Sequence, residues 1–158
     1  MSSNLIRLSG LTAMVGGVLW ALWSAGQLQG FGGGGEVGGP SFDPYVFFNR
    51  LLPLILLPVL AGFAGLHAAQ RKSDGGLGAV GFAVVLVGLA LVVAGSVGEF
   101  WFFYDQPYGQ PNGRDASWTL FLLGHPVLAV GTLLFGIATV RAGVFPRDAS
   151  MMFAGLGT

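Results

Sequence analysis

The chain of 158 residues has no cysteine, only two histidines and few charges. Without cysteine it has no disulfide, no thiolate metal ligand and no thiol nucleophile. A zinc site would need several carboxylates beside His67 and His125, and the sequence clusters none near either residue. We therefore expect no metal centre, and no other catalytic motif indicates an enzyme.

Charged residues make up only 9% of the sequence, whereas soluble domains carry about 25%. Lys and Arg balance Asp and Glu, so the net charge is zero and we expect no nucleic-acid partner. Hydrophobic residues account for 53% of the chain. This composition predicts a protein whose surface faces the lipid bilayer.

Four long stretches are nearly free of charge, and a helix needs about 20 apolar residues to cross a bilayer. They cover residues 8–27, 45–70, 75–104 and 116–140. The sequence therefore predicts an all-α, polytopic four-helix bundle that forms one transmembrane domain over residues 1–158. Residues 28–44 read as a glycine-rich outer loop, and residues 141–158 as a cytoplasmic or interfacial tail. Two alternatives stay open: a cleaved signal peptide at the N-terminus, and a fifth span that begins in the tail.

Small residues recur at regular intervals in three of these spans, which lets helix backbones approach closely in lipid. They fall every fourth residue in the first span (Ser9, Ala13, Gly17, Ala21, Ala25) and every seventh in the third (Gly81, Gly88, Gly95) and the fourth (Ser117, Gly124, Gly131, Ala138). An antiparallel hairpin of spans three and four would place Gly95 level with Gly124, Gly88 with Gly131 and Gly81 with Ala138. We expect these two spans to pack tightly and the first span to keep its small face for another subunit.

Basic residues indicate the orientation. With four spans and a cytoplasmic N-terminus, five basic residues lie inside (Arg7, Arg71, Lys72, Arg141, Arg147) and two outside (Arg50, Arg114), as the positive-inside rule requires. Five aromatic residues then form a belt at the outer interface (Tyr45, Trp101, Tyr104, Tyr108, Trp118). The predicted location is the inner (plasma) membrane, with both termini in the cytoplasm.

Glu99 closes the uncharged run of the third span and adjoins a spanning segment. Counting residues from the predicted turns places Arg50 and His125 at a similar depth, just below the outer surface. Ionisable groups inside a membrane are usually paired and face the bundle interior. One interpretation is a structural ion pair; the other is a proton or solute site with Glu99 as carrier, His125 as titrating neighbour and Arg50 as counter-charge.

His125 also suggests an axial ligand for haem or a chlorin, because the adjoining Gly124 leaves room for a flat ring. Against this, Gly124 already belongs to the packing pattern, and His67 lies too near the other end of its span to share a haem with His125. The aromatic run from Phe100 to Tyr104 offers an alternative site for a quinone. The sequence leaves these cofactor assignments open.

Three stretches resemble small multi-span bacterial integral membrane proteins of unassigned function: LSGLTAMVGGVLWALW from Leu8, GEFW from Gly98 and LFGIATVR from Leu134. The likeness covers most of the chain and rests on apolar segments. It implies a bacterial membrane protein and no particular activity, and some proteins of this type continue into a further span.

These patterns predict a non-catalytic protein that serves as an accessory or structural subunit of a membrane complex, or as a homo-oligomer. Its expected partners are the lipid bilayer and other membrane subunits or a second copy. The alternatives are proton or small-solute transport at Arg50, Glu99 and His125, and binding of haem, chlorin or quinone in the outer leaflet.

Overall fold

The computed structural model describes residues 3–28, 44–73 and 76–143. In these ranges the chain forms α1 (Ser3–Leu28), α2 (Pro44–Gln70), α3 (Leu77–Val97), a π-helical turn η1 (Gly98–Phe102) that continues α3, and α4 (Gly113–Ala142), with no strand among the described residues. The predicted all-α class is confirmed. The predicted glycine-rich loop, apart from its two ends, and the tail beyond residue 143 lie outside the described residues.

Among the described residues, three segments are long and apolar enough to cross a bilayer: Tyr45–Gln70, Leu77–Phe102 and Gly113–Ala142. The apolar part of α1, Gly10–Ala25, is shorter. Large apolar side chains are exposed on all four helices, among them Leu22, Leu57, Val87 and Leu123. Exposure of so much apolar surface is unfavourable in water but favourable in the lipid of a bilayer. The chain is therefore a helical membrane protein.

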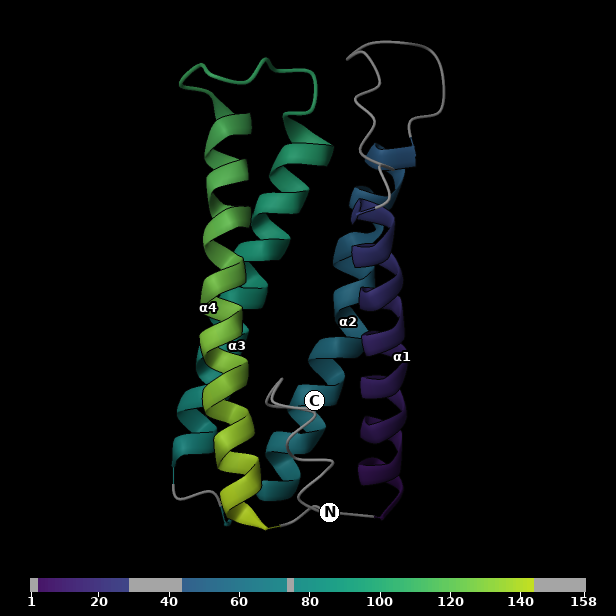
Figure 1. Ribbon diagram of the computed structural model, residues 1–158, viewed down its shortest axis with the longest axis vertical. Coiled ribbons are helices and arrows are strands. Elements are labelled where there is room, and N and C mark those ends of the chain that lie inside the picture. The colour runs from purple at the N-terminus through teal and green to yellow at the C-terminus, as the bar shows by residue number, and fades with distance from the viewer. Residues whose placement is uncertain (1–2, 29–43, 74–75, 144–158) are drawn as a thin grey trace.

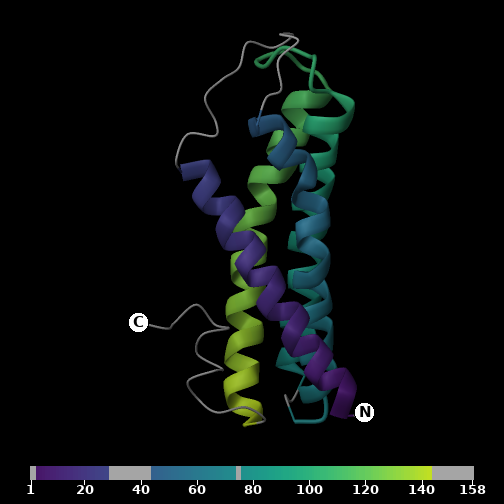
Figure 2. The same cartoon turned by 90° about the vertical axis from the view of Figure 1, so that its right-hand side faces the viewer.

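The helices form two pairs, α1 with α2 and α3 with α4, which stand side by side in Figure 1. Contact is most extensive between α3 and α4, and α2 joins the two pairs through α3. Figure 2 shows that α1 is inclined to the other three helices. The start of α1 and the end of α4 lie at one end of the molecule, and the loop between η1 and α4 lies at the other.

Five glycines hold α3 and α4 at close range. They are called the glycine ladder here (Gly81, Gly88, Gly95, Gly124, Gly131), and each lies against the backbone of the opposite helix. A Cβ atom on Gly88 would lie 2.6 Å from the backbone nitrogen of Leu128, and one on Gly131 would lie 2.6 Å from that of Val85. No side chain fits at such a distance, so the approach of the two helices depends on glycine.

The register of this hairpin differs from the predicted one by nearly a helical turn. Gly88 faces Leu128, three residues before Gly131, and Gly81 faces Phe135, three residues before the buried Ala138. Opposed glycines would leave empty space between the helices. A glycine opposite a larger residue fills that space and gains dispersion contacts, so the two sets of glycines interleave.

Only part of the small face predicted for α1 packs against α2. A Cβ atom on Gly62 of α2 would lie 2.7 Å from the Cβ of Ala13, and one on Gly16 would lie 2.7 Å from the backbone nitrogen of Val59. These residues bring α1 and α2 together. Gly17 has no such neighbour within 4 Å of its Cβ position, and Ala21 is exposed. Part of the small face of α1 is therefore left unused by α2.

The core lies among α2, α3 and α4. It consists of six buried residues (Leu52, Leu56, Val85, Leu89, Val92, Phe121), and Trp20 and Trp23 of α1 pack against it. A buried hydrogen bond crosses the core, because the hydroxyl of Ser96 on α3 donates to the backbone oxygen of Asn49 on α2 at 3.0 Å. The bond gives the buried Ser96 hydroxyl a hydrogen-bond partner among the apolar side chains that surround it.

Candidate functional site

The π-helical turn η1 places Glu99 at the end of α3 that faces the loop to α4. The backbone N–H of Phe103 donates to the oxygen of Gly98 at 2.9 Å, a bond across five residues that widens the helix. Gly98 itself lies against the side chain of Ser117 on α4. Turns of this kind often occur at functional sites, and here the turn directs a fully buried carboxylate toward the loop.

One oxygen of Glu99 has a partner and the other has none. The hydroxyl of Tyr108, in the loop, donates a hydrogen bond to Oε1 of Glu99. Oε2 is buried without a hydrogen-bond partner in the described structure. Burial of a carboxylate oxygen that has no protein donor is costly, because desolvation of the charged group is not offset by a hydrogen bond within the protein. Glu99 is therefore an unusual buried carboxylate.

Arg114 supplies the positive charge that acts on Glu99. Its guanidinium is nearly buried and lies over the ring of Tyr108, 3.8 Å from the centroid, and over that of Tyr104, 5.1 Å away. One terminal nitrogen donates to the backbone oxygen of Gln106 at 2.8 Å, whereas Nε has no partner. Cation–π contacts of this kind hold the guanidinium beside the loop tyrosines.

Tyr108 is set up to act as a hydrogen-bond donor. Burial of its hydroxyl and its hydrogen bond to Glu99 raise the pKa of Tyr108 above the usual range of tyrosine. The phenol therefore keeps its proton throughout the physiological pH range and continues to bind the carboxylate.

Arg50 reaches the same region by another route. Its Nε donates to the backbone oxygen of Phe100 at 2.7 Å, and its guanidinium lies 5.9 Å from the centroid of the Tyr104 ring. Within the described ranges, Arg50 makes no hydrogen bond or ion pair with Glu99. Five residues form what we call the loop-end cluster (Arg50, Glu99, Tyr104, Tyr108, Arg114), in which the two arginines share Tyr104.

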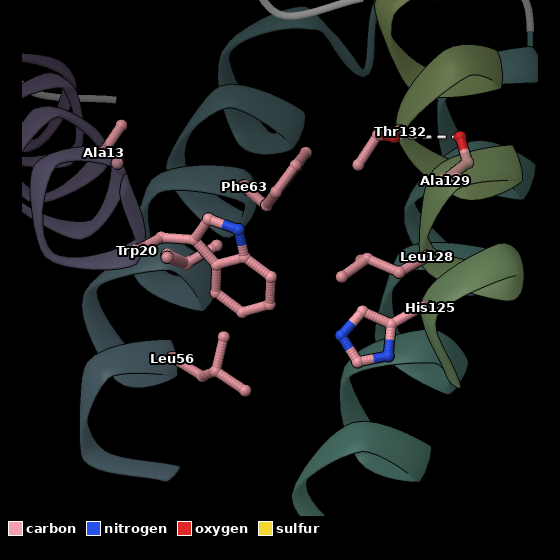
Figure 3. A pocket seen from close by; sticks show the side chains of 10 residues that line it. Ala13, Trp20, Leu56, Phe63, His125, Leu128, Ala129 and Thr132 are labelled. Carbon is pink, nitrogen blue, oxygen red and sulfur yellow. Dashed lines mark hydrogen bonds between the residues drawn. The ribbon is translucent and has the colours of Figure 1, made fainter. Parts of the chain in front are cut away.

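His125 lies apart from this cluster, in a cavity of about 400 Å³ between α1, α2 and α4. Figure 3 shows the ring of His125 on α4 directed toward the indole of Trp20 on α1. The two ring centroids are 6.3 Å apart. The other residues that line this His125 cavity are mostly apolar and include Gly17, Leu56, Phe63 and Thr132. The structure thus brings Arg50 and Glu99 to one region and His125 to another.

A backbone contact fixes the tautomer of His125. Nδ1 lies 2.8 Å from the backbone oxygen of Phe121, one turn earlier in α4. A carbonyl oxygen only accepts hydrogen bonds, so Nδ1 must carry a proton. In the neutral ring Nε2 is then the acceptor, and it is the nitrogen that points into the cavity in Figure 3. His125 can therefore accept a hydrogen bond from a ligand or hold a metal through one nitrogen.

No group of three or more potential metal ligands occurs in the described part of the chain. An ion held by His125 would therefore need its other ligands from a cofactor. The second histidine, His67, stacks on Phe82 with centroids 4.6 Å apart. It does not line the His125 cavity.

The polar cluster predicted from the sequence did not include Tyr104, Tyr108 or Arg114, nor did it include Trp20. Arg114 and Tyr108 were assigned to the outer loop and the aromatic belt, and Trp20 was not connected with His125. A usable signal exists for Arg114, because Asn112 is a good N-cap and places this arginine inside the first turn of a helix. Nothing in the sequence pairs Tyr108 with Glu99, because that contact depends on the path of the loop.

Comparison with known proteins adds no relative: no family model, no curated protein and no solved structure matches this chain. The fold is that of a helical membrane protein with a loop-end cluster, in which Glu99 and Arg114 are buried, and a separate cavity at His125.

Proposed function

We propose that this chain is a non-catalytic subunit of the inner membrane, which associates through α1 with another membrane protein or with a second copy. The observation that carries the proposal is the unused small face of α1. Gly10 and Gly17 have no atom of a neighbouring helix within 4 Å of their Cβ positions, and Ala21 is exposed. Gly17 follows Gly10 by about two helical turns, and Ala21 follows Gly17 by about one turn. The three residues therefore lie on one side of the helix.

The contrast with the other helices supports this assignment. Each residue of the glycine ladder is covered by the partner helix, and so are Gly16 and Gly62 between α1 and α2. In lipid, helices associate where small residues let backbones meet, because there is no hydrophobic drive to bring them together. A helix that presents Gly10, Gly17 and Ala21 to lipid therefore has the surface that a further helix needs.

The proposed topology has four spans with both termini in the cytoplasm. Arg71 and Lys72 follow α2, and Arg141 lies in the last turn of α4, at the same end as the start of α1 (Figure 1). Arg50 and Arg114 lie toward the opposite end, with the loop between η1 and α4. This distribution supports the positive-inside orientation. The proposal takes α1, which is inclined to the other helices (Figure 2), as the fourth span.

The test is purification of tagged protein from native membranes in mild detergent, with wild type compared to Ala21→Leu. We expect the wild type to elute with a stoichiometric partner or as an oligomer. Ala21→Leu should lower the amount of that partner by at least about tenfold, because one added side chain separates the backbones. Val15→Leu is the matched control, since Val15 is also exposed on α1 but lies on another side.

Elution of the wild type alone, as a monomer, contradicts the proposal. So does equal recovery of the partner with Ala21→Leu and Val15→Leu. Ala21 is the better test position than Gly17, because Gly17 also lines the His125 cavity and a change there would alter two surfaces.

A second candidate function, proton or small-solute transport, is favoured by one observation, the buried and unpartnered Oε2 of Glu99. A carboxylate in this state could exchange a proton or a cation where a fully bonded one could not. Glu99→Gln keeps the shape and removes the charge. Transport requires that proton flux into proteoliposomes falls to that of protein-free vesicles in Glu99→Gln, while partner recovery stays unchanged. Equal flux in wild type and variant excludes this function.

A further inference from the structure

In the proposed four-span topology, the His125 cavity lies at the depth of the bilayer. It lies between two helices that hardly meet, because α1 contacts α2 extensively but scarcely touches α4. His125 is about 18 Å along α4 from Gly113 at 1.5 Å per residue, well away from either end of the helix. A ligand of this cavity must therefore be soluble in lipid.

Three side chains give the cavity its polar chemistry: His125, Thr132 and Trp20, whose indole N–H is a donor. The Thr132 hydroxyl is occupied, since it donates to the backbone oxygen of Ala129 at 2.9 Å, as Figure 3 shows. Nδ1 of His125 is bound to Phe121, so Nε2 is the nitrogen left to face a ligand. The acceptor Nε2 of His125 and the donor N–H of Trp20 together favour a ligand group that both donates and accepts, which a hydroxyl does and a carbonyl or an ether does not.

The size and shape of the cavity favour a single ring. A volume of about 400 Å³ is near the lower limit of ligand pockets, roughly 300–1,000 Å³. The indole of Trp20 faces the imidazole across the cavity, and Gly17 leaves open space beside it. A flat aromatic ring can stack on that indole while its substituent reaches His125.

A second cavity, between α2 and α3, shows what a purely apolar site looks like. It has a similar volume, about 480 Å³, and is lined by leucines, Pro53, Ala90 and Val93, with no polar side chain. Such a cavity holds any acyl chain equally well. The imidazole nitrogen distinguishes the His125 cavity from it and gives the cavity a means of selection.

We propose that the His125 cavity binds a lipid-soluble phenol of the hydroquinone class, with a ring hydroxyl donating to Nε2 of His125 and the ring stacked on Trp20. The proposal goes beyond the association of α1 with a partner and does not rest on it. It concerns binding alone and includes no electron transfer.

The experiment compares three ligands of nearly equal size: tetramethylhydroquinone, tetramethylbenzoquinone and the dimethyl ether of the hydroquinone. Each is equilibrated without oxygen with nanodiscs that contain the full chain and with empty nanodiscs, and the retained ligand is measured after sedimentation. We expect about one hydroquinone per protein above the empty control. The quinone and the ether should bind at least about tenfold more weakly, because neither donates to the nitrogen.

Three variants assign the site. His125→Phe removes the acceptor and should reduce binding of the hydroquinone to the level of the ether. Ala129→Phe fills the cavity from α4 and should abolish binding of all three ligands. Val130→Phe adds the same ring at the next position, where the side chain is exposed and does not line the cavity, and should bind like the wild type. A thermal melt of each variant shows that it is folded.

Equal retention of the hydroquinone and its dimethyl ether overturns the role of His125 as acceptor. Retention no higher than in empty nanodiscs overturns the site. A purified protein that carries a haem absorption band, lost in His125→Phe, would replace the hydroquinone by a tetrapyrrole and also overturn the proposal. Each of these outcomes leaves the α1 association intact, because Ala21 does not line the cavity.

Discussion

Glycines inside apolar helices have different structural roles in this chain. Gly95 lies against α4, where a Cβ atom would stand 2.7 Å from the Cα of Phe121. Gly10 lies on α1 with no neighbouring helix within 4 Å of its Cβ position. Gly95 permits two helices of this chain to pack closely, whereas Gly10 makes no such contact within the chain.

Replacement by alanine separates these two cases. We expect Gly95→Ala to destabilise the protein by about 1–3 kcal/mol, because α3 and α4 must move apart to accept the methyl group. Gly10→Ala should be neutral or stabilise by up to about 1 kcal/mol, since alanine favours the helix. Unfolding in increasing SDS, followed by circular dichroism, measures both. Similar stability of the two variants would show that the α3–α4 contact is looser than described.

The hydrogen bond from Tyr108 to Glu99 makes stability depend on pH at the alkaline end. An unfolded tyrosine loses its proton near pH ~10, and the folded Tyr108 holds its proton to higher pH. The bond is therefore fully present below about pH 10, and above it the unfolded chain releases a proton that the folded chain keeps, so stability falls as the pH rises.

Tyr108→Phe tests this bond. The variant should be less stable than the wild type by about 1–2 kcal/mol at neutral pH, because Oε1 of Glu99 loses its donor. It should also lack the part of the alkaline decline that Tyr108 causes. Melting temperatures of both proteins from about pH 8 to about pH 11 provide the measurement. Identical pH profiles would argue against a bonded phenol, and a smaller effect of Tyr108→Phe in Glu99→Gln would assign the loss to this pair.

At this scale the sequence reveals some site residues and hides others. Glu99 is visible because it is the one carboxylate inside the four predicted spans, and His125 is visible as an imidazole inside a span. Tyr108 and Arg114 become partners of Glu99 only through the path of the loop, which no periodicity encodes. Trp20 comes near His125 through the tilt of α1, which residue spacing along α1 does not fix.

At the scale of elements, the apolar runs predict the helices closely. The spans expected at residues 45–70 and 116–140 correspond to α2 (Pro44–Gln70) and α4 (Gly113–Ala142). The helix α4 begins earlier than expected because Asn112 caps it: the side-chain oxygen accepts from the backbone N–H groups of Arg114 and Asp115. The π-turn at the end of α3 was not predicted, since one extra residue per turn leaves no mark on an all-apolar pattern.

The cap at Asn112 also positions the loop-end cluster, because it fixes the first turn of α4 and with it Arg114. We expect Asn112→Ala to destabilise the protein by about 1 kcal/mol. Asn112→Asp keeps an oxygen acceptor and should be close to the wild type, because aspartate caps about as well as asparagine. Chemical or SDS unfolding compares the two variants. Equal losses in both would mean that the amide nitrogen, which donates to the oxygen of Pro107 at 2.7 Å, matters more than the cap.

The register of α3 on α4 illustrates why spacing alone does not determine packing. Spacing at every seventh residue shows that both helices have a small face, and the structure places the two faces together. Equal-depth counting then assumes the length of the connecting loop. The π-turn and the path of the loop shift the register by nearly a turn, and interleaved packing is better filled than glycine on glycine.

At the scale of the whole molecule, the cysteine-free sequence makes the topology easy to measure. Lys72 lies in the turn after α2, Gln110 lies in the loop before α4, and both are exposed. In the proposed orientation, Gln110→Cys reacts with a membrane-impermeant maleimide on intact cells, and Lys72→Cys reacts only after the cells are permeabilised. The reverse pattern would invert the orientation, and labelling of both residues from outside would rule out a span between them.

The extent of packing differs between the helix pairs, and this difference determines which part of the molecule can move. At each glycine of the ladder the backbones of α3 and α4 are in close contact. The two helices cannot slide along each other without first separating, so this pair behaves as a rigid unit. The α1–α2 pair touches that unit mainly through α2, and α1 lies over the His125 cavity with little contact to α4. Access from the bilayer to the imidazole of His125 therefore widens when α1 moves away from α4. A partner bound to the lipid-facing side of α1 would restrict this movement and so regulate access to the cavity.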